Sequence, residues 1–297
     1  MHFMARPRGD RMGSIRIVRS PVVAVMAASP RPRNPDMRSR RNGHRHRYIP
    51  AVLAVLSALV LPVARADDNP GYDRPGLGFT PAVLKAGDVT WEQGLPDWSR
   101  GRDAGVASAQ YVADGLLRVG LGGSLELQLG SSWNRLRQSG AGTDLRGDGR
   151  GDSTLGVKFA LPASGDFSWG LLGSVEFTDG ARAFRNPQRQ YLLGADFNWQ
   201  WNARNTAALY LQDVRAGGRD SRLLALNDGY ALTRTLNVYA EAVLLRDATV
   251  GHGSMAGAGV AWQATPRVQL DASARHRLSG HADEWQAGLG VAVYFGR

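Results

Sequence analysis

The sequence predicts an all-β protein, a transmembrane antiparallel up-and-down β-barrel of about twelve strands with an extended N-terminal segment. The clearest observation is the last stretch, 283–295, in which every second residue is apolar: Trp285, Ala287, Leu289, Val291, Val293 and Phe295. Side chains of a strand alternate between its two faces, so this stretch is apolar on one side and polar or small on the other. A membrane-spanning strand needs about 9 to 11 residues that face lipid and lumen in turn. The same pattern recurs through the second half of the chain.

The front of the chain carries the net charge of +10 and predicts an export signal. Residues 1–66 hold 13 Arg against two acids, whereas the remainder holds 23 bases and 24 acids, so no nucleic-acid partner is expected. Residues 37–66 have a basic stretch after Met37, an apolar run and a small-x-small site at Ala64-Arg65-Ala66, which is typical of a cleaved signal peptide. A basic membrane-anchored arm is the alternative. Residues 1–36 are an extension, either a start assigned too early or a disordered basic segment.

The mature chain divides into an extended segment, 67–87, and a barrel, 88–297. Prolines at 70, 75 and 81 exclude the segment from a sheet, and it could fold into the barrel mouth. Twelve strands are expected, at 88–93, 116–121, 124–133, 154–161, 168–178, 190–201, 206–213, 222–232, 236–245, 254–263, 268–276 and 283–295. An exported chain without cysteine needs rigidity from elsewhere, and a closed ladder of backbone hydrogen bonds supplies it.

The lengths of the connections support the same fold. Short links follow every even-numbered strand, at 122–123, 162–167, 202–205, 233–235 and 264–267. The longest links, 94–115, 134–153 and 179–189, follow odd-numbered strands. Outer-membrane barrels have tight periplasmic turns and longer outer loops, so both termini are expected in the periplasm. One strand is irregular, because Asn227 and Asp228 are adjacent and one of them must break the alternation.

Several short motifs resemble a known family. They are Asp73-Arg74-Pro75-Gly76, Val83 to Gly87, Leu117 to Leu121 and Leu125 to Gly130, with Glu92 on the first strand. The chain resembles the outer-membrane proteins of the putative MetA-pathway of phenol degradation family, whose members are described as transporters. The resemblance implies movement of aromatic or other small hydrophobic compounds across the outer membrane. This chain ends Phe295-Gly296-Arg297, whereas substrates of the barrel-assembly machinery commonly end on the aromatic residue itself.

The strand register predicts which charges line the lumen: Glu92, Arg118, Glu126, Lys158, Glu176, Asp196, Glu241, Asp271, Arg275 and Glu284. Seven acids against three bases make the interior negative. In one interpretation these groups line a polar path that selects solutes. In the other, Arg118 pairs with Glu126 and Lys158 with Glu176, and the pairs have only a structural role.

Enzymatic and metal-binding motifs are weak. Ser254, His252 and Asp247 share one loop but lack the spacing of a nucleophile elbow. Asp144, Asp148 and Asp152 do not have the spacing of an EF-hand. We therefore expect no enzyme, no cofactor and no metal.

The predicted function is a passive outer-membrane channel for small molecules, with membrane lipid and the barrel-assembly machinery as partners. The alternative is a non-conducting structural or surface-interaction barrel whose lumen is closed by internal charge pairs and by 67–87. A soluble exported β-sandwich is the rival fold, disfavoured because the outward faces of its strands would be polar.

Overall fold

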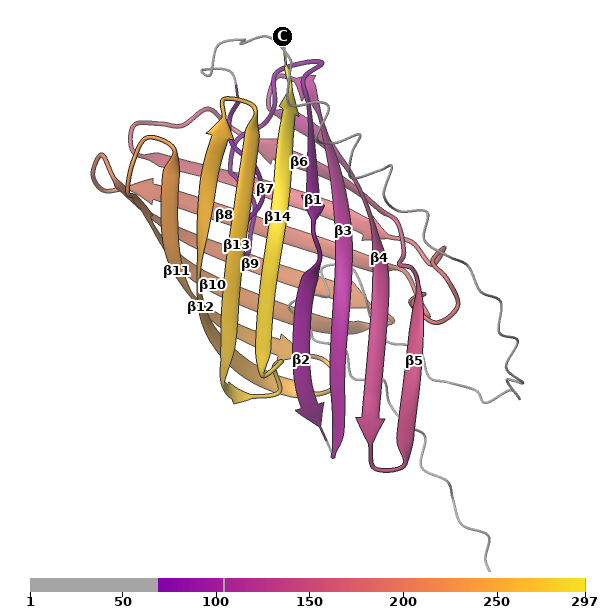
Figure 1. The fold of residues 1–297 in the computed structure, drawn as a ribbon. Coiled ribbons are helices and arrows are strands. Elements are labelled where there is room, and N and C mark those ends of the chain that lie inside the picture. Colours follow the sequence, from indigo (N-terminus) through magenta and orange to yellow (C-terminus); the bar gives the residue numbers. More distant parts are fainter. Residues whose placement is uncertain (1–68, 104, 297) are drawn as a thin grey trace, which may run out of the picture.

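The computed structural model describes residues 69–103 and 105–296, and within them the chain is all-β (Figure 1). The strand segments are β1 (Val89–Gly94), β2 (Asp97–Asp103), β3 (Val106–Gly122), β4 (Leu125–Gly140), β5 (Thr143–Arg150), β6 (Thr154–Ala160), β7 (Phe167–Glu176), β8 (Gln190–Gln200), β9 (Asn205–Ala216), β10 (Arg219–Ala231), β11 (Leu236–Asp247), β12 (Gly251–Thr265), β13 (Val268–Gly280) and β14 (Trp285–Phe295). No helix in these residues is long and apolar enough to span a membrane. The predicted extension, 1–36, and signal peptide, 37–66, lie outside the described residues.

The fourteen segments form a closed barrel of twelve strands, which confirms the predicted fold class. β1 and β2 both lie between β14 and β3, so they are two parts of one strand, interrupted at Leu95-Pro96. Proline lacks the N–H that a ladder requires, which explains the interruption. In the same way β5 and β6 both pair with β4 and continue each other. All neighbours are antiparallel, and the pairing of β1 with β14 closes the sheet.

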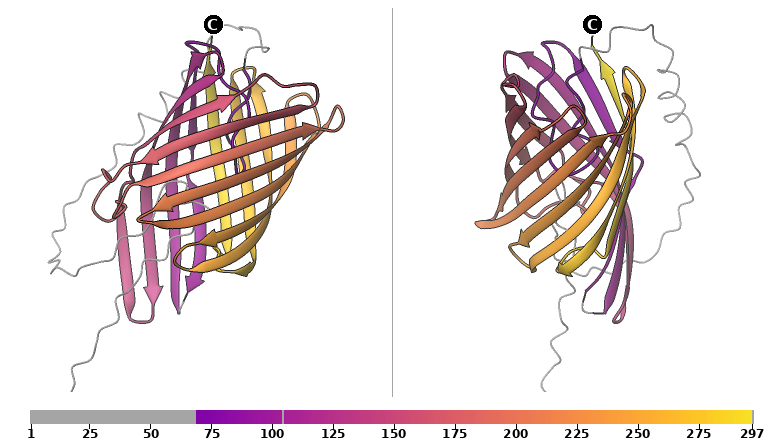
Figure 2. Two further views of the ribbon diagram at one scale, coloured as in Figure 1. Left: turned by 180° about the vertical axis from the view of Figure 1, so that it is seen from behind. Right: turned by 90° about the vertical axis from the view of Figure 1, so that its left-hand side faces the viewer.

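Two predicted loops are wrong. Residues 94–115 and 134–153 are not long links, because β2 and β3 form one extended hairpin and β4 and β5 form another. These two hairpins project beyond the rest of the wall on the side away from the C-terminus (Figures 1 and 2). Outside lipid a strand no longer needs an apolar outward face, so their sequences lose the alternation that identifies a membrane strand. The third predicted link, 179–189, does lie in the connection between β7 and β8.

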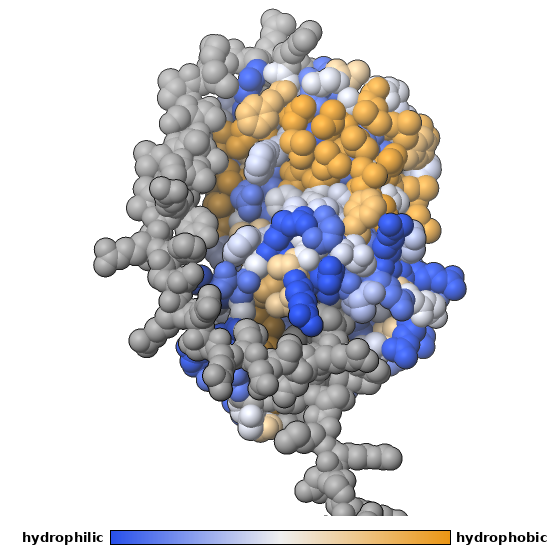
Figure 3. All heavy atoms as spheres, turned by 90° about the vertical axis from the view of Figure 1, so that its right-hand side faces the viewer, coloured by the Kyte–Doolittle hydropathy of each residue, from blue (hydrophilic) through white to orange (hydrophobic). Residues whose placement is uncertain are grey.

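The two faces of the wall differ as the alternation requires. Outward Leu193 and Trp199 are 62% and 56% exposed, whereas inward Glu126 and Lys158 are fully buried. Figure 3 shows an apolar band over one wall, with the polar projecting hairpins beyond it. In the irregular strand, β10, the side chain of Asn227 approaches Gly76 in the interior, and Asp228 is exposed.

The interior contains a segment of the chain as well as wall side chains. Residues 69–87 enter the lumen, and Phe79 packs among inward residues of β9 to β12: Tyr210, Leu223, Ala225, Val243, Leu245 and Met255. The ring of Phe79 meets that of Tyr210 edge-on, with centroids 5.9 Å apart. Leu84 is 1% exposed and lies in a second cluster with Tyr72, Ala292 and Tyr294. The segment is therefore a packed part of the fold.

Candidate functional site: a polar lumen crossed by the N-terminal segment

A charge cluster lies on one wall of the lumen. Glu92 on β1, Arg118 on β3, Glu126 on β4 and Lys158 on β6 project inward from consecutive strands, and each is at most 1% exposed. Arg118 contacts Glu126 (Nε–Oε1, 2.8 Å) and Glu92 (Nη1–Oε1, 2.8 Å). Lys158 Nζ lies 3.1 Å from Glu126 Oε1. Two bases and two acids thus balance one another along this wall.

Asp73 of the entering segment joins that cluster. Its carboxylate lies 3.0 Å from Lys158 Nζ and 3.4 Å from Arg118 Nη1. The backbone amides of Asp73 and Arg74 donate to the two carboxylate oxygens of Glu92, at 3.0 and 2.8 Å. Gln128 Nε2 also donates to Asp73, at 2.8 Å. The cluster therefore holds the segment by charge and by its backbone.

Arg74 contacts carboxylates on three strand segments of the wall. Its guanidinium lies 3.0 Å from Asp97 on β2, 3.4 Å from Asp114 on β3 and 3.4 Å from Asp271 on β13. Gln269 donates to the carbonyl of Arg74 at 2.8 Å. A guanidinium has five donors in a fixed fork, so one arginine can satisfy several carboxylates at once. Adjacent residues Asp73 and Arg74 thus link the segment to both sides of the seam formed by β14 and β1.

Two further carboxylates hold the segment beyond this point. Asp196 on β8 accepts the amide of Phe79 at 3.2 Å, and Glu126 accepts the amide of Leu84 at 3.1 Å. Buried backbone N–H groups need a partner, and these two carboxylates supply it to the amides of Phe79 and Leu84. Inward carboxylates therefore take the place of a neighbouring strand.

The segment separates two cavities. One, of about 230 Å³, lies toward the projecting hairpins and has Asp73 to Phe79 as its floor, with Trp98, Val112, Leu116, Leu172, Leu192 and Tyr210 among its walls. The other, of about 670 Å³, lies at the opposite end of the barrel, where the short turns and the C-terminus are. It is bounded by 80–86 and by the turns at 122–123 and 160–167. Between them the lumen is occupied by residues 73–84.

The remaining predicted lumen residues lie outside the main cluster. Arg275 Nε and Glu241 Oε1 are 2.7 Å apart, although the N–H does not point at the oxygen, so this is an ion pair rather than a hydrogen bond. The pair reaches across β12, where a side chain on Gly257 would meet Arg275 Cγ at 2.6 Å. Glu284 is half-buried and lies 3.6 Å from Arg277.

One predicted pairing is correct and one is wrong. Arg118 does contact Glu126, but Lys158 contacts Asp73 and Glu126 instead of Glu176. The register explains the error: Lys158 lies opposite Leu172, and Glu176 is four residues further along β7. At about 3.4 Å per residue that is a separation of about 14 Å along the strand.

Sequence reasoning missed four charged residues of the site: Asp73, Arg74, Asp97 and Asp114. In the sequence Asp73-Arg74 stands out only as a family motif, and Asp97 and Asp114 fall in the predicted link 94–115. One feature of the sequence could have indicated that Asp73 and Arg74 are buried: they are adjacent residues of opposite charge in a proline-rich segment that leads into a barrel.

The other candidate sites do not assemble. Ser254 Oγ bonds to Ser279 Oγ at 2.7 Å, and the carboxylate of Asp247 caps its own turn by accepting the amides of Thr249 and Val250. Asp152 is buried and accepts the amides of Gly180 and Asn186, whereas Asp144 and Asp148 are exposed on β5. Among residues 69–103 and 105–296, no group of three or more acidic or histidine side chains is placed to hold a metal ion.

The closed antiparallel wall, apolar outside and polar inside, defines an outer-membrane-type β-barrel. Its fold is similar to that of an outer membrane channel from Pseudomonas putida F1, with a TM-score of 0.59 and 13% sequence identity over 75% of this chain and 99% of that chain. It also matches the KdgM porin, with a TM-score of 0.45 and 9% identity over 70% of this chain and 99% of the porin.

Residues 72–295 match the family described as "Putative MetA-pathway of phenol degradation", and the chain belongs to that family. The resemblance expected from the short motifs is confirmed. No curated protein sequence matches the chain.

Proposed function

We propose that the protein is a channel for the passive passage of small molecules across the bacterial outer membrane. Family membership and the fold support this proposal. The observation that carries it is the pair of cavities, one on each side of a single irregular segment, inside a continuous wall. Export through a cleaved signal peptide and insertion by the barrel-assembly machinery belong to the same proposal.

The barrier in this channel is the segment rather than the charge pairs of the wall. Glu92, Arg118, Glu126 and Lys158 pair along adjacent strands and do not reach across the lumen. What crosses is residues 73–84, attached by hydrogen bonds from backbone amides to carboxylates, by ion pairs and by the packing of Phe79 and Leu84. The polar contacts can exchange for water when the segment moves, whereas a wall of strands cannot open without losing its ladder. This argument disfavours the permanently closed barrel.

The solutes we propose are small aromatic or otherwise hydrophobic compounds. The cavity of about 230 Å³ has apolar side chains, among them Phe79, Leu172 and Tyr210, and also many polar and charged ones, among them Asp114 and Arg275. The apolar walls suit the ring of a small molecule, and the polar groups fix its orientation. The family's description points to the same class of compound.

Liposome swelling tests this function directly. Proteoliposomes should admit uncharged solutes of graded size, with phenol-sized aromatic solutes entering faster than sugars of equal mass. Phe79→Ala should reduce that preference at least severalfold, because Phe79 lines the cavity. Trp199→Ala is the control, since Trp199 is an aromatic residue that is 56% exposed on the outer wall and lines neither cavity. Swelling that does not differ from protein-free liposomes for every solute would rule out the channel.

A further inference from the structure

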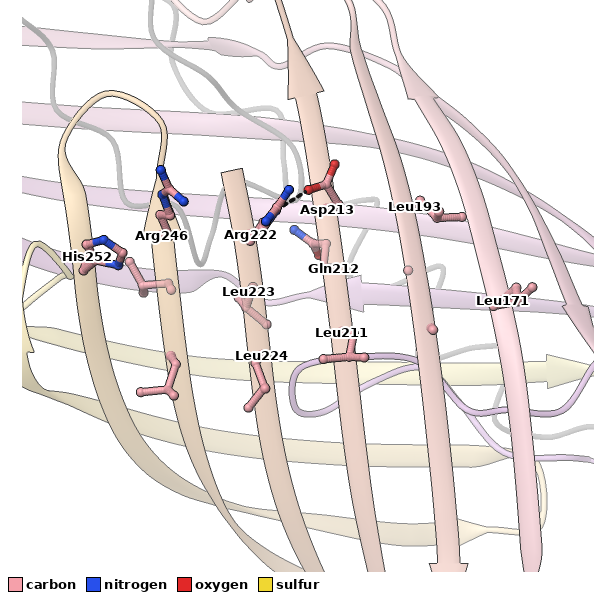
Figure 4. Close-up of a pocket in the computed structure, with 14 residues that line it drawn as sticks. Leu171, Leu193, Leu211, Gln212, Asp213, Arg222, Leu223, Leu224, Arg246 and His252 are labelled. Atoms are coloured by element: carbon pink, nitrogen blue, oxygen red, sulfur yellow. Dashed lines mark hydrogen bonds and ion pairs between the residues drawn. The ribbon is translucent and has the colours of Figure 1, made fainter. Parts of the chain in front are cut away.

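A third hollow lies on the outer wall, away from the two cavities of the lumen (Figure 4). Arg222 on β10 is directly opposite Arg246 on β11, and Arg246 is directly opposite His252 on β12. All three side chains are exposed, whereas Leu223 and Leu245, the inward neighbours in sequence, are 6% and 4% exposed. The three groups therefore form one row across the outward face of three adjacent strands.

This row is electrostatically unbalanced. Directly opposed residues of an antiparallel pair have Cβ atoms about 4.5–5.5 Å apart, and like charges in that arrangement are destabilising. Arg222 is offset by Asp213 on β9, with Nε and Oδ1 2.9 Å apart. Neither Arg246 nor His252 makes a side-chain ion pair or hydrogen bond with another residue in the described part of the chain. A bound anion would remove the repulsion.

Immediately next to the row, toward the middle of the wall, the surface is leucine-rich. Leu171, Leu211, Leu224 and Leu244 lie on it, and Leu193 borders the row itself. Together with the basic row they line a hollow of about 550 Å³. Leu193 and Leu244 are 62% and 59% exposed, so the hollow is open to whatever surrounds the barrel.

The position of the row matches a membrane surface. Tyr191, which is 55% exposed, lies two residues beyond Leu193 toward the hairpin tips, and Arg246 is one residue from the end of β11. Aromatic side chains mark the interface between hydrocarbon and water in such barrels. The basic row lies two residues, about 7 Å, on the membrane side of Tyr191, a distance that the long side chains of arginine span to place their guanidinium groups at headgroup depth. The leucines then lie at acyl-chain depth, on the side of the longer hairpins.

We propose that Arg222, Arg246 and His252 bind the phosphate of a membrane lipid whose acyl chains lie along the leucines. At the outer surface of the outer membrane this lipid is a phosphorylated glycolipid of the lipid A type. Guanidinium groups form short, charge-assisted hydrogen bonds with phosphate, and two of them from adjacent strands can hold one phosphate from two sides. Asp213 orients Arg222 and keeps the row from being uniformly basic.

Native mass spectrometry of the full protein in neutral detergent tests this proposal, with purified lipid A as the probe. Each charge-assisted contact is worth about a tenfold change in affinity, so Arg222→Gln with Arg246→Gln should weaken binding about a hundredfold. Arg135→Gln is the control, because Arg135 is an exposed arginine on β4 that lies opposite Asp148 instead of another base. It should leave binding unchanged.

Two further probes identify the ligand chemistry. Dephosphorylated lipid A should bind the wild type as weakly as lipid A binds the double variant, and inorganic phosphate alone should not compete at equal concentration. Equal binding of the phosphorylated and dephosphorylated forms would overturn the proposal, and so would equal losses in Arg135→Gln and the double variant. Full competition by inorganic phosphate would assign the row to a free anion and would also overturn the lipid assignment. Since the substitutions are on the exposed surface, unchanged urea unfolding midpoints verify that the variants fold.

Discussion

Replacing Asp73 by Asn removes the charge that fastens the entering segment to the wall. The carboxylate is 3.0 Å from Lys158 and 3.4 Å from Arg118, and it also accepts the amide of Thr80 at 2.9 Å. Asparagine keeps the shape and can still accept from Thr80, but it carries no charge to attract Lys158 and Arg118. The variant therefore isolates the ionic contribution of Asp73 and leaves the ion pairs of Arg74 in place.

The size of the effect follows from burial. A hydrogen bond to a charged group contributes about 1.5–3 kcal/mol. The variant weakens two such contacts, to Lys158 and to Arg118, and both cations keep Glu92 and Glu126 as partners, so we take the lower end for each contact, about 3 kcal/mol in total. Because about 1.4 kcal/mol corresponds to a factor of ten, the ratio of displaced to seated segments should rise about a hundredfold. The barrel wall, which has its own ladder, should remain folded.

Single-channel recording in planar bilayers measures this ratio as the open probability. The wild type should be mostly closed, with rare openings, and Asp73→Asn should open about a hundredfold more often. Asp144→Asn is the matched control, since Asp144 forms a largely exposed ion pair with Arg146 on a projecting hairpin and should change nothing. An unaltered open probability in a folded Asp73→Asn barrel would refute the idea that this segment is the barrier.

Two other outcomes are expected. Glu241→Gln should lower the free energy of unfolding in detergent by about 3 kcal/mol, because it leaves the buried Arg275 without its partner. Glu284→Gln is the control at the half-exposed pair with Arg277 and should cost less than about 1 kcal/mol in the same urea titration. Equal losses in the two variants would contradict the burial of the Glu241 pair. Although desolvation acts to raise it, the pKa of Asp179 is held below its ordinary value by hydrogen bonds from the Ser153 amide and hydroxyl and from a neighbouring arginine. The stabilisation from the contact of Asp179 with Ser153 is then complete above the unfolded pKa of about 3.9 and is lost as the pH falls through the lower folded value. The NMR shift of the Ser153 amide should therefore titrate with a midpoint below about pH 3.9. A midpoint above that value would contradict the contact.

The wall of the barrel could be read from the sequence because a lipid-facing strand leaves a strong local signal. From 190 onward, alternation placed each strand within a few residues of its true position, and the short turns followed in the expected order. The signal fails where strands leave the membrane. The tips of β2 and β4 have polar residues on both faces, and the tip of β3 is rich in alanine, so the sequence predicts loops at 94–115 and 134–153 although these are hydrogen-bonded hairpins.

Inward-facing charges could be predicted from the alternation of side chains along each strand, but their partners could not. The alternation places Lys158 and Glu176 on the same face of neighbouring strands, whereas the register places them four residues apart. Partner choice also depended on a segment that has no periodicity. Nothing local predicts that Asp73 lies between Lys158 and Arg118, 85 and 45 residues away along the chain.

By itself the sequence determined which residues face lipid and which face the lumen, since a period of two is a property of each strand alone. Only the tertiary structure decided what closes the lumen. What closes it depends on the width of the lumen, because this width decides whether Asp73 and Arg74 can reach charged side chains on strands that are remote in sequence. Closure also sets Arg222, Arg246 and His252 side by side on the outer face, where three unremarkable residues become one basic row.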